Sequence, residues 1–308
     1  MKLSIIIVHY KTYDLTLRCI RSIYTSNSSF DFEIIVIDND SQDGAGESVT
    51  SEFSTVKWIY NNTNAGFGRA NNLGVLNANG EYILFLNSDM LVLKDSIIDC
   101  LAYIQKNPTI GVLGPKLLNE DGTFQKSAYS YIGDQQEILK DNLLLDKLFN
   151  FNSPSIKAVM GSFMIIPKNV FEQVQGFDPD FFMYCEELDL CERIHALGYT
   201  IHYLESVTAI HKHGGSSTAS NWSTRQTYLS RSLLVYKRKG LLQYFISHAL
   251  YHFNFITNFF LMWLLDTNYR KSYWLVLRSY FSNWLIYWTI PFNFTRKLGS
   301  GSKLLKSA

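Results

Sequence analysis

Acidic and amide side chains follow two apolar stretches near the start of the chain. Asp38 and Asn39 come directly after FEIIVI, and Ser88 and Asp89 come after YILFLN. In open α/β sheets, ligands collect outside the carboxyl ends of the strands. A carboxylate at Asp38 could accept a hydrogen bond from a nucleotide base or a ribose hydroxyl, and Asp89 is a candidate metal ligand. The alternative is that both segments are only capped turns leading into helices.

A run of small residues, NNTNAGFGRANNLG, contains a second candidate binding segment. Asn64, Gly66, Gly68 and Asn72 lie where a helix is expected to begin. Little side-chain bulk at a helix N-terminus lets a phosphate or a sugar approach the backbone N–H groups. Glycine in this place could equally serve close packing.

Three acids within four residues, Glu186, Glu187 and Asp189, crowd the start of another predicted helix. Their aromatic surroundings would raise a pKa, which suits a general base. Carboxylates at a helix N-terminus also simply favour the helix dipole. His211 precedes a glycine-rich loop, where it is either a structural residue or a metal ligand alongside Asp89.

The elements that must position these residues are apolar strands alternating with helical segments. Strands are expected at 3–10, 32–39, 56–61 and 82–89, with helices at 13–26, 43–53, 67–78 and from Ser96. This alternation predicts βαβ units with a parallel sheet, and hence a Rossmann-like half. Residues 110–210 predict further strands around one helix, and the chain beyond Gly215 is expected to be almost entirely helical. Neither GxGxxG after the first strand nor GxxxxGK[ST] is present, so dinucleotide and P-loop enzymes are not supported.

Charge is divided unevenly along the 308 residues. Residues 1–205 contain 15 Lys and Arg against 26 Asp and Glu, whereas residues 206–308 contain 13 against the single Asp266. An acidic body fits a cation-dependent site, and a basic aromatic tail fits an anionic surface. The four cysteines lack metal-finger spacing and are expected to be reduced. The apolar start is too short for a signal peptide, which predicts a cytoplasmic protein.

Six motifs occur in a specific order: VIDNDSQDG, NAGFGRANN, FLNSD, GSFMIIPK, GFDPDFFMYCEELDLCERIHALGY and HKHGGSS. The ordered set resembles the family 2 glycosyltransferases of the GT-A fold, and among them the rhamnosyltransferase-like enzymes of bacterial O-antigen and cell-wall polysaccharide synthesis. The resemblance covers about residues 3–240. It implies an α/β catalytic domain over residues 1–215, with a mixed, mainly parallel sheet. The nucleotide-binding half would end at about residue 110 and the acceptor half would follow it, with a helical region over residues 216–308.

The resemblance implies that Asp38 contacts the nucleotide base and that Asp89 holds Mg²⁺ or Mn²⁺ on the donor diphosphate. The metal motif, Asn87-Ser88-Asp89, contains only one carboxylate. The residues expected to bind the donor are Asp38, Asn39, Asn64, Gly66, Asn72 and Ser88.

The same family pattern assigns roles to two later motifs. His211 matches a metal-ligand histidine in an HxxGxS motif, which Gly214 and Ser216 complete. Glu187 matches the catalytic base, and its neighbour Glu186 is the alternative.

The implied reaction is the inverting transfer of a single sugar, such as L-rhamnose, from a dTDP- or UDP-linked donor. The acceptor would be a glycan or a polyprenyl-diphosphate-linked glycan. A processive synthase is not supported, because the QxxRW signature is missing. The alternative from another class is a non-catalytic sugar-nucleotide or glycan-binding module with the same fold. Nucleic acid is not an expected partner, since the basic tail has apolar, tryptophan-rich faces.

Residues 241–265 are long enough to span a bilayer, yet they contain two His and two Asn. On a helix their polar side chains form a single stripe, made of Gln243, Ser247, Tyr251, Asn254 and Asn258. Residues 272–289 show a similar division, and basic residues flank both segments. This pattern predicts helices that lie in the interface of the inner face of the cell membrane. The alternative is a helical surface for homo-oligomerisation or a cover for the catalytic domain.

Overall fold

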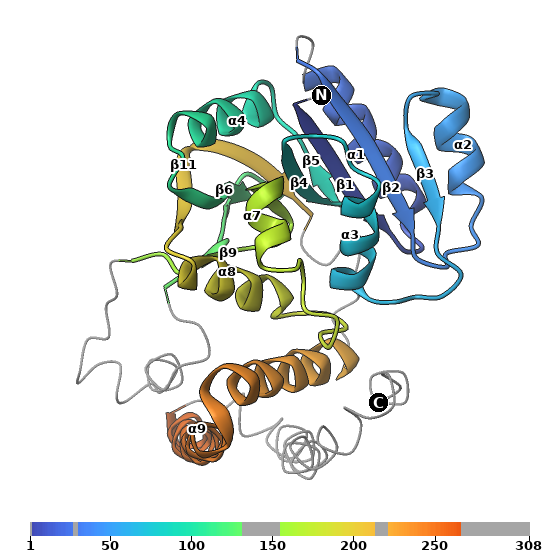
Figure 1. Ribbon diagram of the computed structural model, residues 1–308. Coiled ribbons are helices and arrows are strands. Elements are labelled where there is room, and N and C mark those ends of the chain that lie inside the picture. Colours follow the sequence, from blue (N-terminus) through green and yellow to red (C-terminus); the bar gives the residue numbers. More distant parts are fainter. Residues whose placement is uncertain (1, 27–29, 131–154, 213–220, 266–308) are drawn as a thin grey trace. The chain divides into compact units, whose positions relative to one another are not determined.

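The computed structural model describes residues 2–26, 30–130, 155–212 and 221–265 (Figure 1). The chain divides into two compact units. One comprises residues 1–130 and 155–220, and the other comprises residues 131–154 and 221–308. The predicted boundary between residues 215 and 216 lies outside the described residues.

The first unit is built around a mixed sheet. Its strands are β1 (Leu3–His9), β2 (Phe32–Asp38), β3 (Lys57–Tyr60), β4 (Tyr82–Asn87), β5 (Met90–Leu91), β6 (Ile110–Leu118), β7 (Phe124–Gln125), β10 (Phe163–Pro167) and β11 (Thr200–His211). Over the described ranges the order is β3-β2-β1-β4-β10-β6-β11-β5, with β7 paired to β6. The first four strands in this order run parallel, whereas β10 is antiparallel to both β4 and β6. Strands β8 (Ala128–Tyr129) and β9 (Ala158–Val159) form a separate antiparallel pair.

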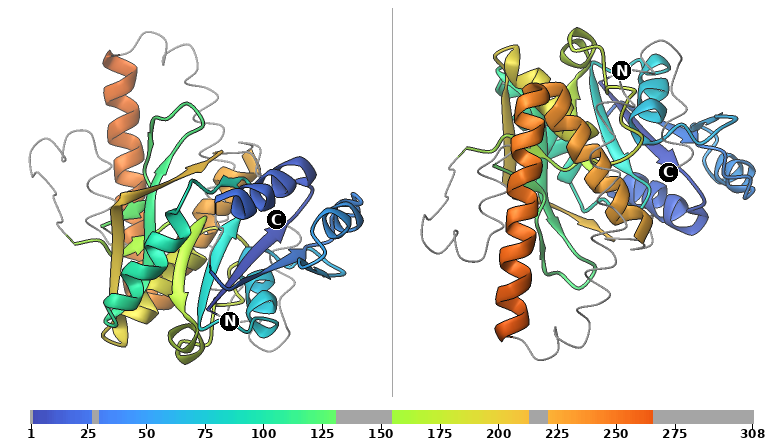
Figure 2. Two further views of the ribbon diagram at one scale, coloured as in Figure 1. Left: turned by 90° about the horizontal axis from the view of Figure 1, so that it is seen from above. Right: turned by 90° about the horizontal axis from the view of Figure 1, so that it is seen from below.

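Helices cover both faces of this sheet (Figures 1 and 2). They are α1 (Tyr13–Ser26), α2 (Ala45–Glu52), α3 (Phe67–Leu76), α4 (Ser96–Lys106), α7 (Lys168–Gln173) and α8 (Glu186–Ala196). Side chains alternate between the faces of a strand. Ile7 therefore joins the core cluster that contains Ile20 of α1 and Ile97 of α4. Its neighbour Ile6 points the other way, and Gly74 of α3 approaches it so closely that a Cβ at Gly74 would collide.

The predicted alternation of strands and helices is confirmed through α4, with boundaries that differ by one or two residues. The expected mixed sheet is also confirmed, although the antiparallel insertion of β10 was not foreseen. The four cysteines, Cys19, Cys100, Cys185 and Cys191, are free and buried. Burial raises the pKa of the Cys100 and Cys191 thiols to about 12, so these thiols stay protonated at neutral pH.

In its described part, the second unit consists of α9 (Asn221–Leu265). Gly240 interrupts this helix with φ 81° and ψ 177°, a backbone conformation that favours glycine. The chain reverses there, and we call residues 221–239 the first arm and residues 241–265 the second arm. Figure 2 (right) shows the two arms meeting at one end. The predicted helix over 272–289 lies outside the described residues.

No helix in the described ranges combines the length and the apolar character that crossing a bilayer requires.

Candidate active site

Three strand ends form the floor of the candidate site. The register of β1 places His9 beside Asp38 of β2 and Val8 beside Asn87 of β4, so the carboxyl ends of these strands are level. Asp38, Ser88 and Asp89 emerge at this edge, and each is only 3% exposed. Parallel pairing therefore brings the base-side and metal-side residues together, as the sequence predicts. Their roles stay predictions.

Asn39 organises the loop that leads from β3 to α3. Its Oδ1 accepts hydrogen bonds from Nδ2 of Asn61 at 2.9 Å and from the backbone N–H of Ala65 at 3.0 Å. Its Nδ2 donates to Oδ1 of Asn64 at 2.8 Å, and the same oxygen accepts from the N–H of Gly66 at 3.1 Å. Asn39, Asn64 and Gly66 are thus brought together, and the contacts support a positioning role for Asn39 beside its predicted donor contact.

Sequence reasoning missed a buried hydrogen-bond chain under this edge. The His9 side chain is fully buried, with Nε2 3.0 Å from Oδ2 of Asp43 and Nδ1 2.8 Å from Oγ1 of Thr16. Thr12 Oγ1 lies 3.2 Å from Thr16 Oγ1 and donates to Ser88 Oγ at 3.1 Å. The chain thus joins the loop after Asp38 to the turn that carries Asp89. The available signal was a histidine inside an otherwise apolar strand end.

His9 also belongs to a potential metal-binding group with Asp38 and Asp43, in which the ligand atoms lie within 4.8 Å of one another. Internal hydrogen bonds already engage these atoms, because His9 contacts Asp43 and Asp38 Oδ1 accepts from the N–H of Ser41 at 2.8 Å. We therefore assign this group to the architecture of the loop.

Asp89 and His211 are neighbours because β5 pairs with the end of β11. This pairing sets His211 opposite Met90, and the N–H of Lys212 donates to the carbonyl of Asp89 at 3.1 Å. Nε2 of His211 then lies 3.3 Å from Oδ1 of Asp89. The predicted pair of metal residues is thus brought together. Gly214 and Ser216, which complete the predicted HxxGxS motif, lie outside the described residues.

The side chains of Asp89 and His211 offer ligand atoms that fit a divalent cation. Nδ1 of His211 lies 2.8 Å from Oε1 of Gln125, and this contact holds the ring with Nε2 toward Asp89. A carboxylate oxygen and an imidazole nitrogen are both common ligands of divalent transition metals. Gln125 plays the orienting part that hydrogen-bonded partners of metal-ligating histidines commonly play.

Glu186 and Glu187 begin α8 after Tyr184 and Cys185 adopt positive φ angles of 67° and 66°. Burial raises the pKa of Glu187 to about 7. The pKa of Glu186 is raised well above its usual range, chiefly by burial and secondly by the nearby charge of Glu187. Glu186 is 4% exposed, whereas Glu187 is only partly buried. An accessible carboxyl with a pKa near neutrality suits a general base better than a buried one that stays protonated.

Glu187 borders the edge of the sheet that carries Asp89. A Cβ at Gly161 would lie 3.3 Å from the Cβ of Glu187. The next residue, Ser162, accepts a hydrogen bond through its carbonyl from the N–H of Asn87 at 2.9 Å. The acid pair and the Asn87–Asp89 turn therefore meet through this short segment.

Helix α3 holds the segment that leads to the acid pair. Nδ2 of Asn72 donates to the carbonyl of Phe177 at 2.8 Å, and Oδ1 of Asn72 accepts from the N–H of Phe177 at 2.9 Å. The N–H of Phe67 donates to the carbonyl of Phe182 at 2.9 Å. Gly66 has φ 85°, and a Cβ there would collide with the same carbonyl oxygen. These contacts give Asn72 and Gly66 positioning roles, while their predicted donor contacts stay predictions.

The fold and this edge together define an α/β enzyme of the GT-A type. Residues 4–175 match the model of glycosyl transferase family 2. The chain therefore belongs to glycosyltransferase family 2 and is a glycosyltransferase, which disfavours the alternative of a non-catalytic binding module. The match ends before Glu186, Glu187 and His211.

Named relatives agree with this class. The chain is 29% identical over 198 residues to the rhamnosyltransferase WbbL of Escherichia coli K12, covering 56% of this chain and 73% of that protein. It is 26% identical over 212 residues to the N-acetylglucosaminyl-diphospho-decaprenol L-rhamnosyltransferase of Mycobacterium tuberculosis, covering 60% of this chain and 67% of the relative.

Solved structures share the fold. A mannosyltransferase of Pyrobaculum calidifontis in complex with GDP-Man and Mn2+ aligns with a TM-score of 0.56 at 14% identity. The alignment covers 80% of this chain and 64% of that one.

Proposed function

We propose that this enzyme is an inverting, metal-dependent glycosyltransferase that moves one sugar from a nucleotide-diphosphate donor to an acceptor hydroxyl. The observation that carries the proposal is the meeting of the Asp89–His211 pair with Glu187 at the edge where Asp38 emerges. A donor diphosphate needs charge neutralisation, and an acceptor hydroxyl needs a base on the opposite side of the reacting carbon. The sheet edge offers groups for both.

Asp89 and His211 would hold the divalent cation. When bound, such an ion stabilises the negative charge that develops on the leaving diphosphate. Carboxylate oxygen suits both Mg²⁺ and Mn²⁺, but an imidazole ligand favours the transition metal. We therefore expect Mn²⁺ to bind more tightly than Mg²⁺.

Glu187 acts as the general base. Its carboxylate takes the proton from the acceptor hydroxyl while that oxygen attacks the anomeric carbon and the nucleoside diphosphate departs. A single displacement inverts the configuration of the anomeric centre. Glu186 keeps its proton and stays in the protein interior, which leaves Glu187 to titrate near neutral pH.

The donor is a dTDP- or UDP-linked hexose, with L-rhamnose as the leading sugar, and the acceptor is a glycan carried on a polyprenyl diphosphate. Both relatives described above are named as rhamnosyltransferases, and one name includes a diphospho-decaprenol acceptor. Such an acceptor resides in a membrane. We therefore expect the reaction at the cytoplasmic face of the cell membrane, with the C-terminal helices as the contact and self-association as the alternative use.

Calorimetric titration with dTDP-rhamnose, UDP-glucose and UDP-N-acetylglucosamine, each with and without Mn²⁺, tests the donor half. Tight binding of one donor, dependent on Mn²⁺ and lost in Asp89→Ala, is the expected result. Metal-independent binding of equal strength to every donor would overturn it. Proton NMR of the transferred anomeric centre then reports inversion or retention.

A further inference from the structure

The second arm of α9 exposes apolar side chains along its whole length. Six of them share one face and are each between 41% and 71% exposed: Leu242, Phe253, Ile256, Phe260, Trp263 and Leu264. At 100° per residue these positions fall within an arc of about 100°. We call this set the apolar stripe. Five of the six lie within residues 253–264. Single exposed apolar residues are ordinary on a protein surface, but a cluster of large ones marks an interaction surface.

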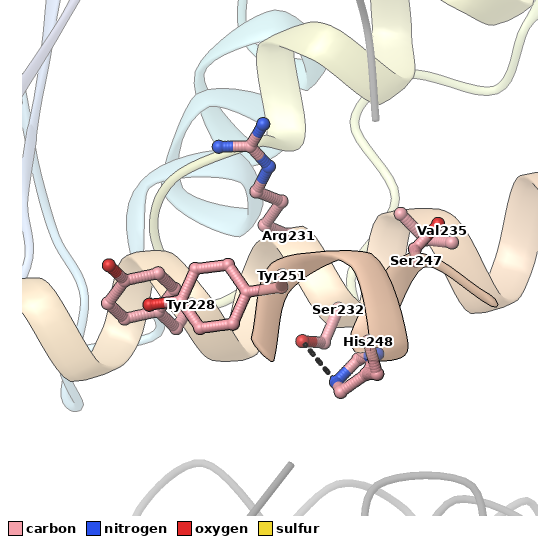
Figure 3. Close-up of a pocket in the computed structure, with 7 residues that line it drawn as sticks. All are labelled: Tyr228, Arg231, Ser232, Val235, Ser247, His248 and Tyr251. Atoms are coloured by element: carbon pink, nitrogen blue, oxygen red, sulfur yellow. Dashed lines mark hydrogen bonds between the residues drawn. The ribbon is translucent and has the colours of Figure 1, made fainter. Parts of the chain in front are cut away.

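The polar side chains of α9 point the other way, into the seam between the two arms. Three pairs span the seam: Tyr228 with Tyr251 at 5.2 Å between ring centroids, Ser232 with His248 at 3.4 Å, and Tyr236 with Tyr244 at 6.0 Å. Figure 3 shows the Ser232–His248 contact and the rings of Tyr228 and Tyr251 in a small pocket of this seam. His248 Nδ1 donates to the carbonyl of Tyr244 at 2.9 Å, so its Nε2 accepts from Ser232. The seam is therefore a mixed interior, in which aromatic rings pack together and a hydrogen bond joins the two arms.

The polar stripe predicted from the sequence is thus not the face that meets water. Ser247 and Asn254, which belong to it, are each only 5% exposed. The second arm buries polar residues beside aromatic ones such as Tyr244, and it carries large apolar residues on its outer face, where a helix on the surface of a globular domain in water carries polar ones. An apolar outer face of this kind gains stability where it meets an apolar medium or another apolar surface.

The positive charge of α9 indicates which kind of partner the apolar stripe contacts. Residues 221–265 contain five Lys and Arg and no Asp or Glu. Three of the five, Lys237, Arg238 and Lys239, directly precede the reversal at Gly240. A second copy of this chain would bring the same positive charges, whereas a leaflet of anionic lipid brings complementary ones, each worth a several-fold gain in binding.

We propose that the apolar stripe lies among the lipid acyl chains of an anionic membrane, with residues 237–239 at the lipid phosphates. The second arm then lies in the interfacial plane, as amphipathic helices with aromatic and basic residues do. This inference rests on the proposed function in one respect, because a lipid-linked acceptor explains why the enzyme benefits from such a contact.

Co-sedimentation with liposomes tests the contact, using phosphatidylglycerol–phosphatidylcholine vesicles and pure phosphatidylcholine vesicles. The full chain should bind the anionic vesicles. The double variant Ile256→Glu/Phe260→Glu places two charges on the stripe and should reduce the partition coefficient at least tenfold. Leu76→Glu is the matched control, because Leu76 is 83% exposed and belongs to α3 of the first unit, and this variant should bind like the parent. Lys237→Gln/Arg238→Gln/Lys239→Gln should weaken binding to the anionic vesicles only.

Two further readouts separate the alternatives. Sedimentation velocity without lipid reports self-association, and calorimetric titration with dTDP and UDP in the presence of Mn²⁺ reports the donor site. Equal binding of the parent and the stripe variant to vesicles overturns the proposal, and so does a stripe-dependent dimer that ignores lipid. A chain that binds vesicles through the stripe but neither nucleotide would instead refute the proposed function and leave the membrane contact standing.

Discussion

The side-chain amide of Asn72 pairs with both polar groups of the Phe177 backbone, donating at 2.8 Å and accepting at 2.9 Å. Asn72 belongs to α3, which follows the donor-side loop, whereas Phe177 belongs to the segment that leads to Glu186 and Glu187. An amide offers both a donor and an acceptor at its tip, so Asn72 satisfies both backbone groups at once. Asn72 therefore helps to hold α3 in register with the segment that leads to the acid pair, together with the Phe67–Phe182 contact.

Replacing Asn72 should cost stability because the Phe177 backbone loses both partners. We expect Asn72→Ala to lower the free energy of unfolding by about 2 kcal/mol, and Asn72→Asp to cost less because it still accepts. Urea denaturation measures both. Asn62→Ala, at an exposed position of the preceding loop, is the control. If Asn72→Ala unfolds at the same urea concentration as this control, the pairing contributes nothing.

Metal affinity should depend on Gln125 although Gln125 is not a predicted ligand. Its Oε1 orients His211, and loss of such a partner typically weakens metal binding about 10–100-fold. Mn²⁺ titration followed by electron paramagnetic resonance should show this loss for Gln125→Ala and a larger one for Asp89→Ala. Gln105→Ala, an exposed glutamine on α4, should match the parent. Unchanged Mn²⁺ affinity in Asp89→Ala would remove the metal assignment altogether.

The rate of transfer should rise with pH through about 7. Burial raises the pKa of Glu187 to about 7, and a base works only when deprotonated, so kcat/KM should climb and then level above this pH. Glu187→Gln should lose about 10²–10⁴ in rate and the pH dependence with it, while donor affinity stays at the parent value. An active Glu187→Gln beside an inactive Glu186→Gln would exchange the two roles.

Glu186 should make the protein less stable as pH increases. Its pKa is raised in the folded state, chiefly by burial, so between the unfolded and folded pKa values the folded chain binds more protons than the unfolded one. The contribution of Glu186 to the free energy of unfolding is fully present below the pKa that it has in the unfolded chain. This contribution declines as pH rises toward the pKa in the folded state. Glu186→Gln should therefore melt above the parent at pH 8 and close to it at pH 4.

Thermal melts at both pH values measure this difference. The exposed Glu205 provides the control, since Glu205→Gln should change neither melt. If the melting temperatures of Glu186→Gln and the parent differ by the same amount at pH 4 and pH 8, ionisation of Glu186 does not destabilise the folded protein.

Much of the sheet follows from local pattern. Residues such as Ile5, Ile7 and Leu84 lie in short apolar runs separated by helical segments, and this alternation suffices to predict parallel strands with polar ends at one edge. The positions of Asp38 and Asp89 follow directly from it. The prediction works because neighbouring parallel strands are joined through helices that are close in sequence.

The remaining features depend on partners that are distant in sequence. The insertion of β10 between β4 and β6 and the pairing of β5 with β11 are decided by long-range packing, and His9 finds Asp43 and Thr16 only after folding. In the second arm, the sequence predicts a polar stripe with Ser247 and Asn254, but periodicity alone cannot say which stripe faces outward. Which face points outward depends on packing against the first arm, and this packing follows from the reversal of the chain at Gly240.

The buried chain that runs from Asp43 through His9 and Thr12 to Ser88 constrains how sequences of this kind can diverge. A change at position 9 removes a hydrogen-bond partner from Asp43 and from Thr16 at once, and the loss at the buried Thr16 is costly. Relatives without histidine at this position should therefore carry compensating changes at the other positions of the chain. The loop after Asp38 and the turn that carries Asp89 would then have to change together, since one set of contacts supports both.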